Sequence, residues 1–568
     1  MELKRIPVGY EDYKELVEGN FYYVDKTLLI KELLDNYAKA HLFTRPRRFG
    51  KSLNLSMLRY FFEKPVDGSS NVHLFADKKI AEQGEQYIKY QEQYPVIMLS
   101  LKSGKQANYE NSLAMLKLEI CKEYKRHRLI VDELTDVDDQ KRFLTICSGK
   151  AEEYMWLEAI AFLSRCLKQY YKKKVVILID EYDVPLENAF YCGFYEQMTS
   201  FIRSLFESAL KTNPALEFAV ITGCLRISRE SIFTGLNNLW ISSILDERYA
   251  GYFGFVQEEV DCLLGYYGLL EKTELIKEWY DGYRFGRTEV YNPWSVINFV
   301  IDSRANVDKF PSEYWSNTSS NSIVRDLIFR ADSETKQDIE NLINGGMVRK
   351  QLHENITYGD INHSSDNLWN FLFFTGYLKL VSIEQAEQQQ YLVMKIPNIE
   401  IKNIYRNQIS DWFHFEMKER NLSVLYKSLL DGNAQLFQKE INYLLRSSIS
   451  YMDNLESFYH GFIMGLLINM EGAIVRSNRE AGNGRYDICV KPYDIEQPSV
   501  ILEFKIADKY ERLDEICNRA LDQIAVRNYD VELPEEGYRK CIYTGIGFFR
   551  KVCRVKTRIV ELSIDFDS

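Results

Sequence analysis

Three consecutive residues, Gly50, Lys51 and Ser52, have the types and order that bind phosphate groups. They follow a short apolar run and precede a segment with helical spacing. A phosphate-binding loop needs backbone N–H groups at a helix N-terminus, a lysine that reaches the outer phosphates and a hydroxyl that binds Mg²⁺. The pattern predicts that Lys51 contacts phosphate, that Ser52 binds Mg²⁺, and that Arg48, Gly50 and Leu53 belong to the same nucleotide-binding loop.

Arg45 stands where the usual loop pattern has glycine. Taken alone, the loop could be a glycine turn before an ordinary helix. A second motif favours nucleotide binding, because Asp180 and Glu181 follow the apolar run 175–179. In this arrangement we expect Asp180 to hold Mg²⁺ through water and Glu181 to polarise the attacking water. Together the two motifs predict an ATPase.

Several other polar residues could complete this site. Arg47 and Arg48 could contact phosphate, or they could pair with the acidic residues after the apolar run. Thr222 ends another apolar run and could sense the outermost phosphate or cap a turn. Arg226 and Arg229 could each act as an arginine finger, although surface ion pairs are the commoner role of such arginines.

A second group of residues has the chemistry of metal-assisted phosphodiester hydrolysis. Glu503 and Lys505 are two residues apart in an apolar run, so their side chains leave the same strand face. Asp487 lies in the preceding expected strand and can join them. Two carboxylates can bind a divalent cation, Mg²⁺ by preference, and a lysine beside them can orient or activate water. The alternative is a salt-bridged pair on a solvated strand face.

Four further features lie near this second group. Glu456 could complete the metal site or be a charge on a helix surface, and His460 could contribute or simply pack. Gln523 is a candidate contact to substrate or to the metal-binding residues. Segment 539–558 contains seven Lys or Arg and no Asp or Glu, so it could follow a phosphate backbone or be an ordinary solvated strand pair.

The elements that must position the first site alternate between strands and helices. Strands are expected at 40–44, 95–101, 175–179 and 218–222, with helices at 52–62, 110–126 and 153–171. Strands separated by helices predict a largely parallel sheet. Residues 255–450 have a mainly helical pattern.

The C-terminal elements follow the order α-β-β-β-α-β. Helices are expected at 453–469 and 512–529, and strands at 473–477, 486–490, 500–504 and 540–545. We therefore predict an α/β protein with three domains: 1–254 as a P-loop domain, 255–450 as a helical lid and connecting, winged-helix-like region, and 451–568 as a nuclease-like domain.

Composition excludes several classes of function. A net charge of −11 argues against a protein that coats nucleic acid by bulk electrostatics, although a local basic groove remains open. The ten cysteines include no C-x-x-C pair, which argues against a zinc ribbon or a disulfide framework. The N-terminus lacks the apolar region of a signal peptide, and the apolar runs are too short to span a bilayer. A cytoplasmic protein that does not bind membranes is expected.

Five motifs resemble those of the bacterial AAA-ATPase-like family, related to archaeal and STAND-type ATPases. They are Tyr22-Tyr-Val-Asp-Lys-Thr27, Thr44-Arg-Pro-Arg-Arg-Phe-Gly-Lys-Ser-Leu53, Leu178-Ile-Asp-Glu-Tyr-Asp183, Ser231-Ile-Phe-Thr-Gly-Leu-Asn-Asn-Leu239, and Tyr280-Asp-Gly-Tyr-Arg-Phe-Gly286 with Tyr291-Asn-Pro-Trp-Ser295. The resemblance covers about residues 1–300, and arginine at position 45 is usual in that family. It implies an ASCE-type sheet, with the strand of the catalytic glutamate between the P-loop strand and its neighbour.

The C-terminal region resembles the PD-(D/E)XK nuclease superfamily over about residues 450–550. The matching residues are Phe458-Tyr-His-Gly-Phe462, Ser477-Asn-Arg-Glu480, Gly484-Arg-Tyr-Asp487, Glu503-Phe-Lys505, and Gln523 with Tyr529. The resemblance implies that Asp487 and Glu503 bind metal and that Lys505 is the catalytic lysine.

The leading hypothesis is an ATPase whose cofactors are ATP and Mg²⁺ and which gates a Mg²⁺-dependent nuclease. The expected partner is nucleic acid, DNA rather than RNA, and the chain could form a homo-oligomer. The alternative is a STAND-like signalling or assembly switch whose nuclease fold serves as a binding surface. A scaffold with both centres inactive is disfavoured because all the expected catalytic residues are present.

Overall fold

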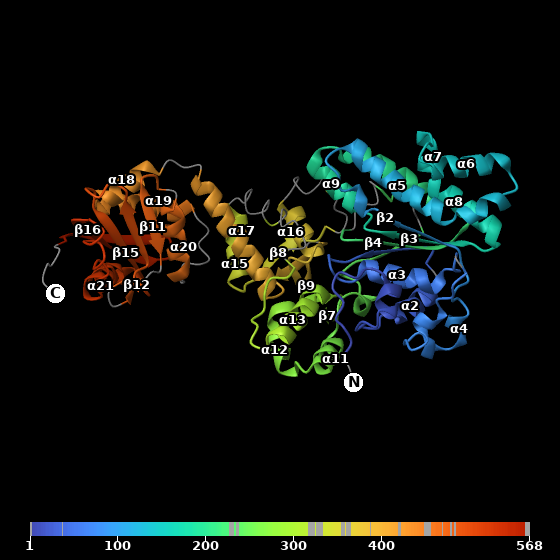
Figure 1. Ribbon diagram of the computed structural model, residues 1–568, viewed down its shortest axis with the longest axis horizontal. Helices are drawn as coiled ribbons and strands as arrows, with labels where there is room; N and C mark the ends of the chain where they lie inside the picture. The colour runs from blue at the N-terminus through green and yellow to red at the C-terminus, as the bar shows by residue number, and fades with distance from the viewer. Residues whose placement is uncertain are drawn as a thin grey trace. The chain divides into compact units, whose positions relative to one another are not determined.

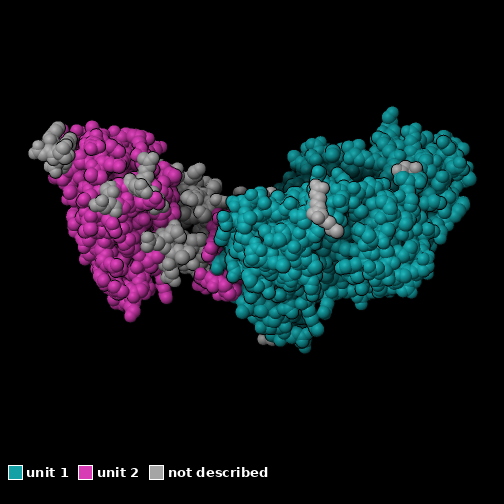
Figure 2. Space-filling model, turned by 60° about the horizontal axis from the view of Figure 1, so that its bottom comes forward, with its two compact units in different colours: residues 1–323, 347–404 teal, residues 324–346, 405–568 magenta. Residues whose placement is uncertain are grey.

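The computed structural model divides into two compact units, shown in two colours in Figure 2. Unit 1 comprises residues 1–323 and 347–404, and unit 2 comprises residues 324–346 and 405–568. No helix among the described residues is long and apolar enough to cross a membrane. The described residues are 3–36, 38–66, 68–225, 232–233, 238–315, 324, 333–353, 358, 365–386, 388–418, 422–447, 456–468, 470–477, 480–481 and 484–562.

A five-stranded parallel sheet forms the centre of unit 1. Its order is β2-β3-β4-β1-β5. The strands are β1 (Ala40–Thr44), β2 (Val96–Ser100), β3 (Val175–Asp180), β4 (Leu216–Gly223) and β5 (Leu239–Ser242). The apolar runs correctly predicted the first four, and the α/β fold class is confirmed. Edge strand β5 was not expected, because it is short and exposes Trp240.

The order of the strands corrects one expectation. β4, which ends near Thr222, lies between the P-loop strand β1 and the acidic strand β3. The expectation that the strand of Glu181 lies beside the P-loop strand is therefore wrong. Lateral order depends on how strands pack across the sheet, and the apolar pattern of each single strand does not encode it.

Helices cover both faces of this sheet. Figure 1 shows α5 (Tyr109–Arg126) and α8 (Ala159–Tyr171) on one face, and α3 (Lys51–Phe62) and α2 (Leu28–Asn36) on the other. The single helix expected at 153–171 is interrupted at Glu158, where φ is −105° and ψ is 5°. The other helices of this part are α1 (Tyr13–Glu18), α4 (Glu85–Ile88), α6 (Val137–Cys147), α7 (Glu153–Leu157), α9 (Val184–Cys192) and α10 (Tyr195–Phe206).

The rest of unit 1 mixes helices with small sheets. Helices α11 (Gln257–Tyr267), α12 (Thr273–Tyr280) and α13 (Pro293–Ala305) share one apolar core. Strands β6 (Tyr283–Phe285) and β7 (Thr288–Val290) form a hairpin. A second, antiparallel sheet has the order β8-β10-β9, and it is followed by the start of α17. These elements are β8 (Val348–Gln351), α16 (Ser365–Phe374), β9 (Lys379–Ala386), β10 (Gln389–Lys395) and α17 (Ile399–Lys418).

Unit 2 is built on a five-stranded mixed sheet with the order β11-β14-β15-β16-β17. Its strands are β11 (Ala473–Ser477), β14 (Ile488–Pro492), β15 (Ser499–Ile506), β16 (Lys540–Phe549) and β17 (Val552–Glu561), with a small hairpin of β12 (Glu480–Ala481) and β13 (Gly484–Arg485). Its helices are α15 (Ser333–Ile343), α18 (Ser423–Leu430), α19 (Ala434–Ser447), α20 (Glu456–Leu467) and α21 (Leu513–Val526).

Two details of unit 2 differ from expectation. Asp487 was placed within a strand, but β14 begins one residue later at Ile488. The last expected strand, 540–545, extends to Phe549 and is followed by its antiparallel partner β17. This agrees with the alternative of a strand pair for segment 539–558, whose polar residues alternate because half of an edge strand faces solvent.

Candidate functional site

The predicted phosphate-binding loop, residues 45–50, connects β1 to α3. Gly50 caps α3 with φ at 80°, a left-handed conformation that glycine adopts without strain. The helix begins at Lys51, so its unpaired N–H groups face the loop. The buried Lys51 ammonium donates hydrogen bonds to the carbonyl oxygens of Arg45 at 3.0 Å and Pro46 at 2.8 Å. The lysine therefore lies folded along the inside of the loop.

Asp180, at the end of β3, receives two hydroxyl groups from other elements. Ser52 Oγ donates to Asp180 Oδ2 at 2.6 Å. Thr222 Oγ1, from β4, donates to Asp180 Oδ1. The position of β4 between β1 and β3 brings this threonine to the carboxylate. The structure thus brings together three residues that the sequence singled out separately.

Glu181 follows Asp180 in an uncommon backbone conformation. Its φ is 51°, in the left-handed region where residues other than glycine are strained, as often found at functional sites. Burial, and then the neighbouring Asp180 carboxylate, raise the pKa of Glu181, while Lys51 and Lys102 oppose the shift. A carboxylate with a raised pKa is a better proton acceptor, as a residue that activates water must be.

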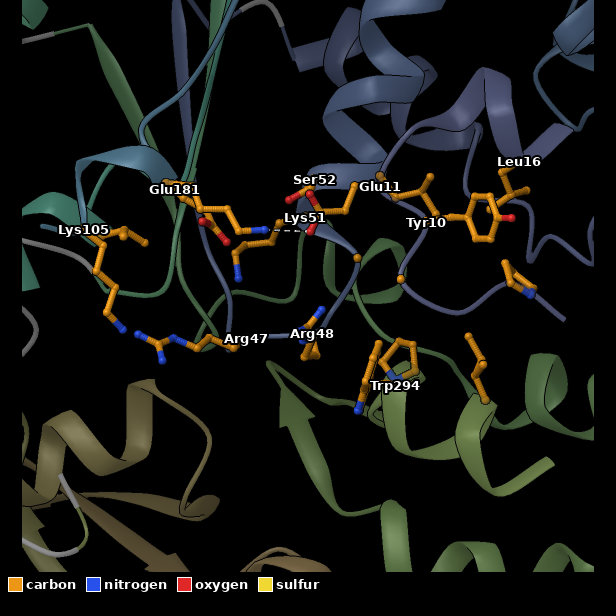
Figure 3. A pocket seen from close by; sticks show the side chains of 18 of the residues that line it. Tyr10, Glu11, Leu16, Arg47, Arg48, Lys51, Ser52, Lys105, Glu181 and Trp294 are labelled. Carbon is orange, nitrogen blue, oxygen red and sulfur yellow. Dashed lines mark hydrogen bonds and ion pairs between the residues drawn. The ribbon is translucent and has the colours of Figure 1, made fainter. Parts of the chain in front are cut away.

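A cavity of about 550 Å³ joins these groups to an apolar surface (Figure 3). Lys51, Ser52 and Glu181 line its centre. Figure 3 shows Arg47 and Lys105 on one side of them and Tyr10, Leu16 and Trp294 on the other. Besides Lys51, the basic residues that line the cavity are Arg47, Arg48, Lys102 and Lys105, and the apolar wall includes Pro7, Leu16, Leu53, Pro293, Trp294 and Ile297.

The loop arginines have three different environments. Arg45 is fully buried and its guanidinium donates to Ser242 O at 2.8 Å and to Ser242 Oγ at 3.1 Å. Arg47 pairs with Glu187 of α9 and not with the acidic residues after β3. Arg48, with φ at 69°, lies over the ring of Trp294 at 4.3 Å.

Three other residues named from the sequence have different outcomes. Asp183 accepts hydrogen bonds from the backbone N–H groups of Cys224 at 2.8 Å and Leu225 at 3.0 Å, so it stabilises the turn after β4. Arg226 and Arg229, the candidate arginine fingers, lie outside the described residues.

The second site lies at the edge where β14 and β15 meet. Asp487 Oδ2 accepts the backbone N–H of Phe504 at 2.7 Å, so its carboxylate lies beside the segment from Glu503 to Lys505. Lys505 Nζ donates to Glu503 Oε1 at 3.2 Å. His460 makes a ring-nitrogen hydrogen bond to the backbone oxygen of Asp487 at 3.0 Å and thereby contacts this site through the main chain.

Two glycines of β16 let α21 approach this site. Gly545 and Gly547 pair in register with Glu503 and Lys505, so all four residues share one face of the sheet. A Cβ atom at Gly545 would lie 2.5 Å from the Cys517 backbone oxygen of α21. This close packing brings Gln523 of α21 to Glu503, to which its amide donates a hydrogen bond, and to the Tyr529 hydroxyl at 3.2 Å.

The donor set at this site fits a hard divalent cation only in part. Asp487 and Glu503 supply carboxylate oxygens, the ligands that Mg²⁺ prefers. Among the described residues no group of three His, Cys, Asp or Glu side chains could hold a metal ion. The side chain of Glu456, at the first position of α20, is outside the described set. Water or substrate oxygens would have to complete the coordination.

The basic segment 539–558 forms β16, β17 and the turn between them, and several of its charges have acidic neighbours. Arg554 and Lys556 lie 3.8 and 3.6 Å from Asp514, and Arg558 lies 3.5 Å from Asp522. All five side chains are partly exposed, so these pairs are weak. The pairs reduce the positive potential that the sequence indicated on this segment.

Trp294 and Lys105 line the first site, but the sequence indicated no role there for either: Trp294 stands only within the motif Tyr291-Asn-Pro-Trp-Ser295, and Lys105 in no motif. Trp294 follows Pro293 at the start of α13, where Asn292 caps the helix by accepting the Trp294 N–H at 2.9 Å. The Asn-Pro-Trp order could have marked a helix start, but nothing in the sequence places that helix beside the phosphate-binding loop.

Comparisons with known proteins identify both regions. Residues 7–233 match the model of the family described as predicted AAA-ATPase, and residues 454–558 match the model of the PD-(D/E)XK nuclease superfamily. A protein of Azotobacter chroococcum mcd 1, described as an uncharacterized protein in the vnfD 5′ region, is 25% identical over 405 residues, which cover 71% of this chain and 69% of that protein. Both family resemblances inferred from the motifs are thereby confirmed.

Proposed function

We propose that this chain, which joins an AAA-ATPase-like domain to a PD-(D/E)XK nuclease-superfamily domain, hydrolyses ATP and uses its nucleotide state to gate cleavage of nucleic acid. The observation that carries the proposal is the 2.6 Å hydrogen bond from Ser52 to Asp180, because Ser52 lines the same cavity as Lys51 and Glu181. These residues come from separate motifs, and a hydroxyl and a carboxylate of this kind hold Mg²⁺ in P-loop phosphoryl transfer, which supports the proposal.

The residues around the cavity fit ATP and Mg²⁺. The hydroxyl of Ser52 and the carboxylate of Asp180 are hard oxygen donors, and Lys51 can turn from the loop carbonyls to the outer phosphates. When bound, the metal neutralises charge on the phosphates. In this proposal Glu181 accepts the proton of the attacking water and Thr222 orients Asp180.

The remaining loop residues bind the nucleotide without reacting. The backbone N–H groups from Gly50 to Leu53 face the phosphates at the start of α3. Arg48 adds positive charge at the rim of the cavity, and its contact with Trp294 holds it there. The apolar wall suits the face of a nucleobase, because it combines an aromatic ring with aliphatic side chains.

For the nuclease domain, we propose that Asp487 and Glu503 hold Mg²⁺ and that Lys505 orients the attacking water. The ion pair between Lys505 and Glu503 supports this role, because it keeps the ammonium beside the Glu503 carboxylate. Gln523 fixes the Glu503 carboxylate from the opposite element. DNA is the first substrate to test and RNA the second.

The test measures ATP hydrolysis and nucleic-acid cleavage in the same full-length preparations. Wild type, Lys51→Ala and Lys505→Ala are incubated with Mg²⁺ and labelled single- and double-stranded DNA and RNA, with and without ATP. We expect Lys51→Ala to lose ATP hydrolysis and the ATP dependence of cleavage. We expect Lys505→Ala to lose cleavage and keep ATP hydrolysis.

Two results would contradict the proposal. If wild type leaves every substrate intact, the nuclease assignment fails, and slow ATP turnover with nucleotide-dependent assembly in a sizing experiment would then favour the STAND-like switch. If Lys505→Ala cleaves as well as wild type, the proposed site is not the source of the cleavage.

A further inference from the structure

Glu400 is a buried carboxyl group in the first turn of α17, outside both sites described above. Its side chain is fully shielded from solvent. Ser295 Oγ lies 3.0 and 2.8 Å from its two carboxyl oxygens, and the backbone N–H of Trp315 donates to Oε1 at 2.9 Å. A buried carboxyl group is costly unless such bonds satisfy it, so these contacts hold three segments of unit 1 together.

One partner of Glu400 contacts the phosphate-binding loop, and the other is adjacent in sequence to a residue that does. The indole N–H of Trp315 donates to the carbonyl oxygen of Arg47 across a long 3.4 Å. Ser295 directly follows Trp294, whose ring lies under the guanidinium of Arg48 at 4.3 Å. Two short routes therefore connect adjacent residues of the loop to one carboxyl group.

Helix α17 connects this carboxyl group to the second unit. The helix runs without interruption from Ile399 to Lys418. Its residues through Ile404 belong to unit 1, and those from Tyr405 onward belong to unit 2. The residue before the helix, Asn398, accepts the backbone N–H of Ile401 at 3.0 Å and donates to the Asp281 carbonyl oxygen at 2.7 Å, which ties the start of the helix to another segment of unit 1. A change in the partners of Glu400 would therefore act on the helix that leads out of the ATPase unit.

We infer that Glu400 is a positioning residue that couples the phosphate-binding loop to the start of α17. A nucleotide bound between the loop and Trp294 restricts the motion of the loop. Because Trp315 and Ser295 link the loop to Glu400, the motion of the start of α17 is restricted as well. This inference rests on the proposed nucleotide binding. The contacts through Trp315 and Ser295 are the route by which the nucleotide state would reach α17. Coupling is reciprocal, so a change at Glu400 also changes nucleotide affinity.

The test measures amide hydrogen exchange in the full-length protein with and without saturating ATP and Mg²⁺. We expect ATP to slow exchange of the peptide covering residues 399–408 by about fivefold, the lower end of ordinary coupling between sites. Glu400→Gln and Trp315→Phe should each abolish most of this difference. Glu289→Gln, which alters an exposed carboxylate on β7, should retain it.

A purely structural role for Glu400 would give another pattern. It would lower the unfolding midpoint of Glu400→Gln but leave the ATP-induced difference at α17 intact, and that result would overturn the inference. Trp315→Phe removes the indole N–H but retains the backbone N–H that bonds Glu400. Its smaller ring fills only part of the buried space, so its unfolding midpoint is measured beside its exchange, and it decides the matter if Glu400→Gln does not fold.

A fluorescent ATP analogue separates the two levels of the proposal. If wild type binds the analogue but amide exchange at residues 399–408 is not slower, the coupling alone is overturned. Wild type that does not bind it overturns the proposed function, and the coupling with it.

Discussion

Arg45 shows why a residue that departs from a motif can still belong to it. The backbone at position 45 is not in the left-handed region, whereas Arg48 and Gly50 are, at φ of 69° and 80°. Glycine is therefore not required at 45 for conformation. The Arg45 side chain lies between Phe253 and Phe285, 5.2 Å from each ring, and bonds to the end of β5. It fastens the loop to the edge of the sheet.

Replacing Arg45 should destabilise the protein. Arg45→Ala leaves the buried Ser242 oxygens without their guanidinium donor and opens space between two rings, and we expect a loss of about 3 kcal/mol in the free energy of unfolding. Urea unfolding followed by circular dichroism measures this. The control is Arg287→Ala, whose side chain is 82% exposed and which should change stability by less than about 0.5 kcal/mol. Equal stability of the two variants would contradict the anchoring role.

Glu181 and Asp183 are both acidic and two residues apart, but their contacts predict different defects. Glu181→Gln should retain ATP binding and lose about 100-fold or more in ATP turnover, because the amide cannot accept a proton. Titration calorimetry and a phosphate-release assay measure the two quantities. The matched control is Glu217→Gln at the start of β4, which should hydrolyse ATP at the wild-type rate.

Asp183→Asn should instead reduce stability, since the carboxylate holds the backbone N–H groups of Cys224 and Leu225. If Glu181→Gln turned over ATP at the wild-type rate, Glu181 would not be the residue that activates water.

The contact between helices α13 and α17 predicts that the stability of the protein depends on pH. Burial raises the pKa of Glu400 from the usual 4.5 to about 7, although hydrogen bonds from Ser295 and the backbone oppose it. Glu313 and the hydroxyls of Tyr280 and Tyr283 also face this carboxyl group. The folded protein therefore binds a proton that the unfolded chain has already released between pH 4.5 and 7.

Because the folded protein binds this extra proton, its free energy of unfolding should fall as the pH rises. The contribution of Glu400 to stability is complete below pH 4.5 and is lost as the pH rises through about 7, by at most about 3 kcal/mol. Glu400→Gln cannot ionise, so its stability should fall less than that of wild type between pH 5 and 8. Urea unfolding at pH 5, 6, 7 and 8 tests this, with Glu289→Gln as the control. Parallel curves for wild type and Glu400→Gln would show that the group does not titrate in this range.

In our proposal the ATPase centre and the nuclease centre both depend on a divalent cation. Chelation with EDTA should stop ATP turnover and nucleic-acid cleavage, and added Mg²⁺ should restore both. Asp487→Asn keeps the size of the side chain but removes a charge. It should therefore raise the Mg²⁺ concentration needed for half-maximal cleavage by about 10-fold or more, without changing the concentration needed for ATP turnover. Magnesium titrations of the two activities give the comparison. Cleavage by Asp487→Asn with the wild-type Mg²⁺ dependence would remove Asp487 from the metal site.

Residues close together in the chain were the most predictable. Gly50, Lys51 and Ser52 indicated a loop before a helix, and the spacing of Glu503 and Lys505 placed both on one strand face, as the structure has them. Local geometry repeats with a period of two or 3.6 residues, so type and spacing alone encode it. The buried strands β1 to β4 were predictable for the same reason, since continuous apolar runs mark a sheet covered on both faces.

Only the tertiary structure decided which distant residues meet. It placed β4 between β1 and β3, which brings Thr222 to Asp180, and it turned the side chain of Arg45 away from the cavity into the core. It also joined the phosphate-binding loop to Glu400 on α17. Such contacts depend on the lateral order of strands and on how helices pack on them. These are set by the burial of the whole apolar surface and are not encoded in the spacing of any one segment.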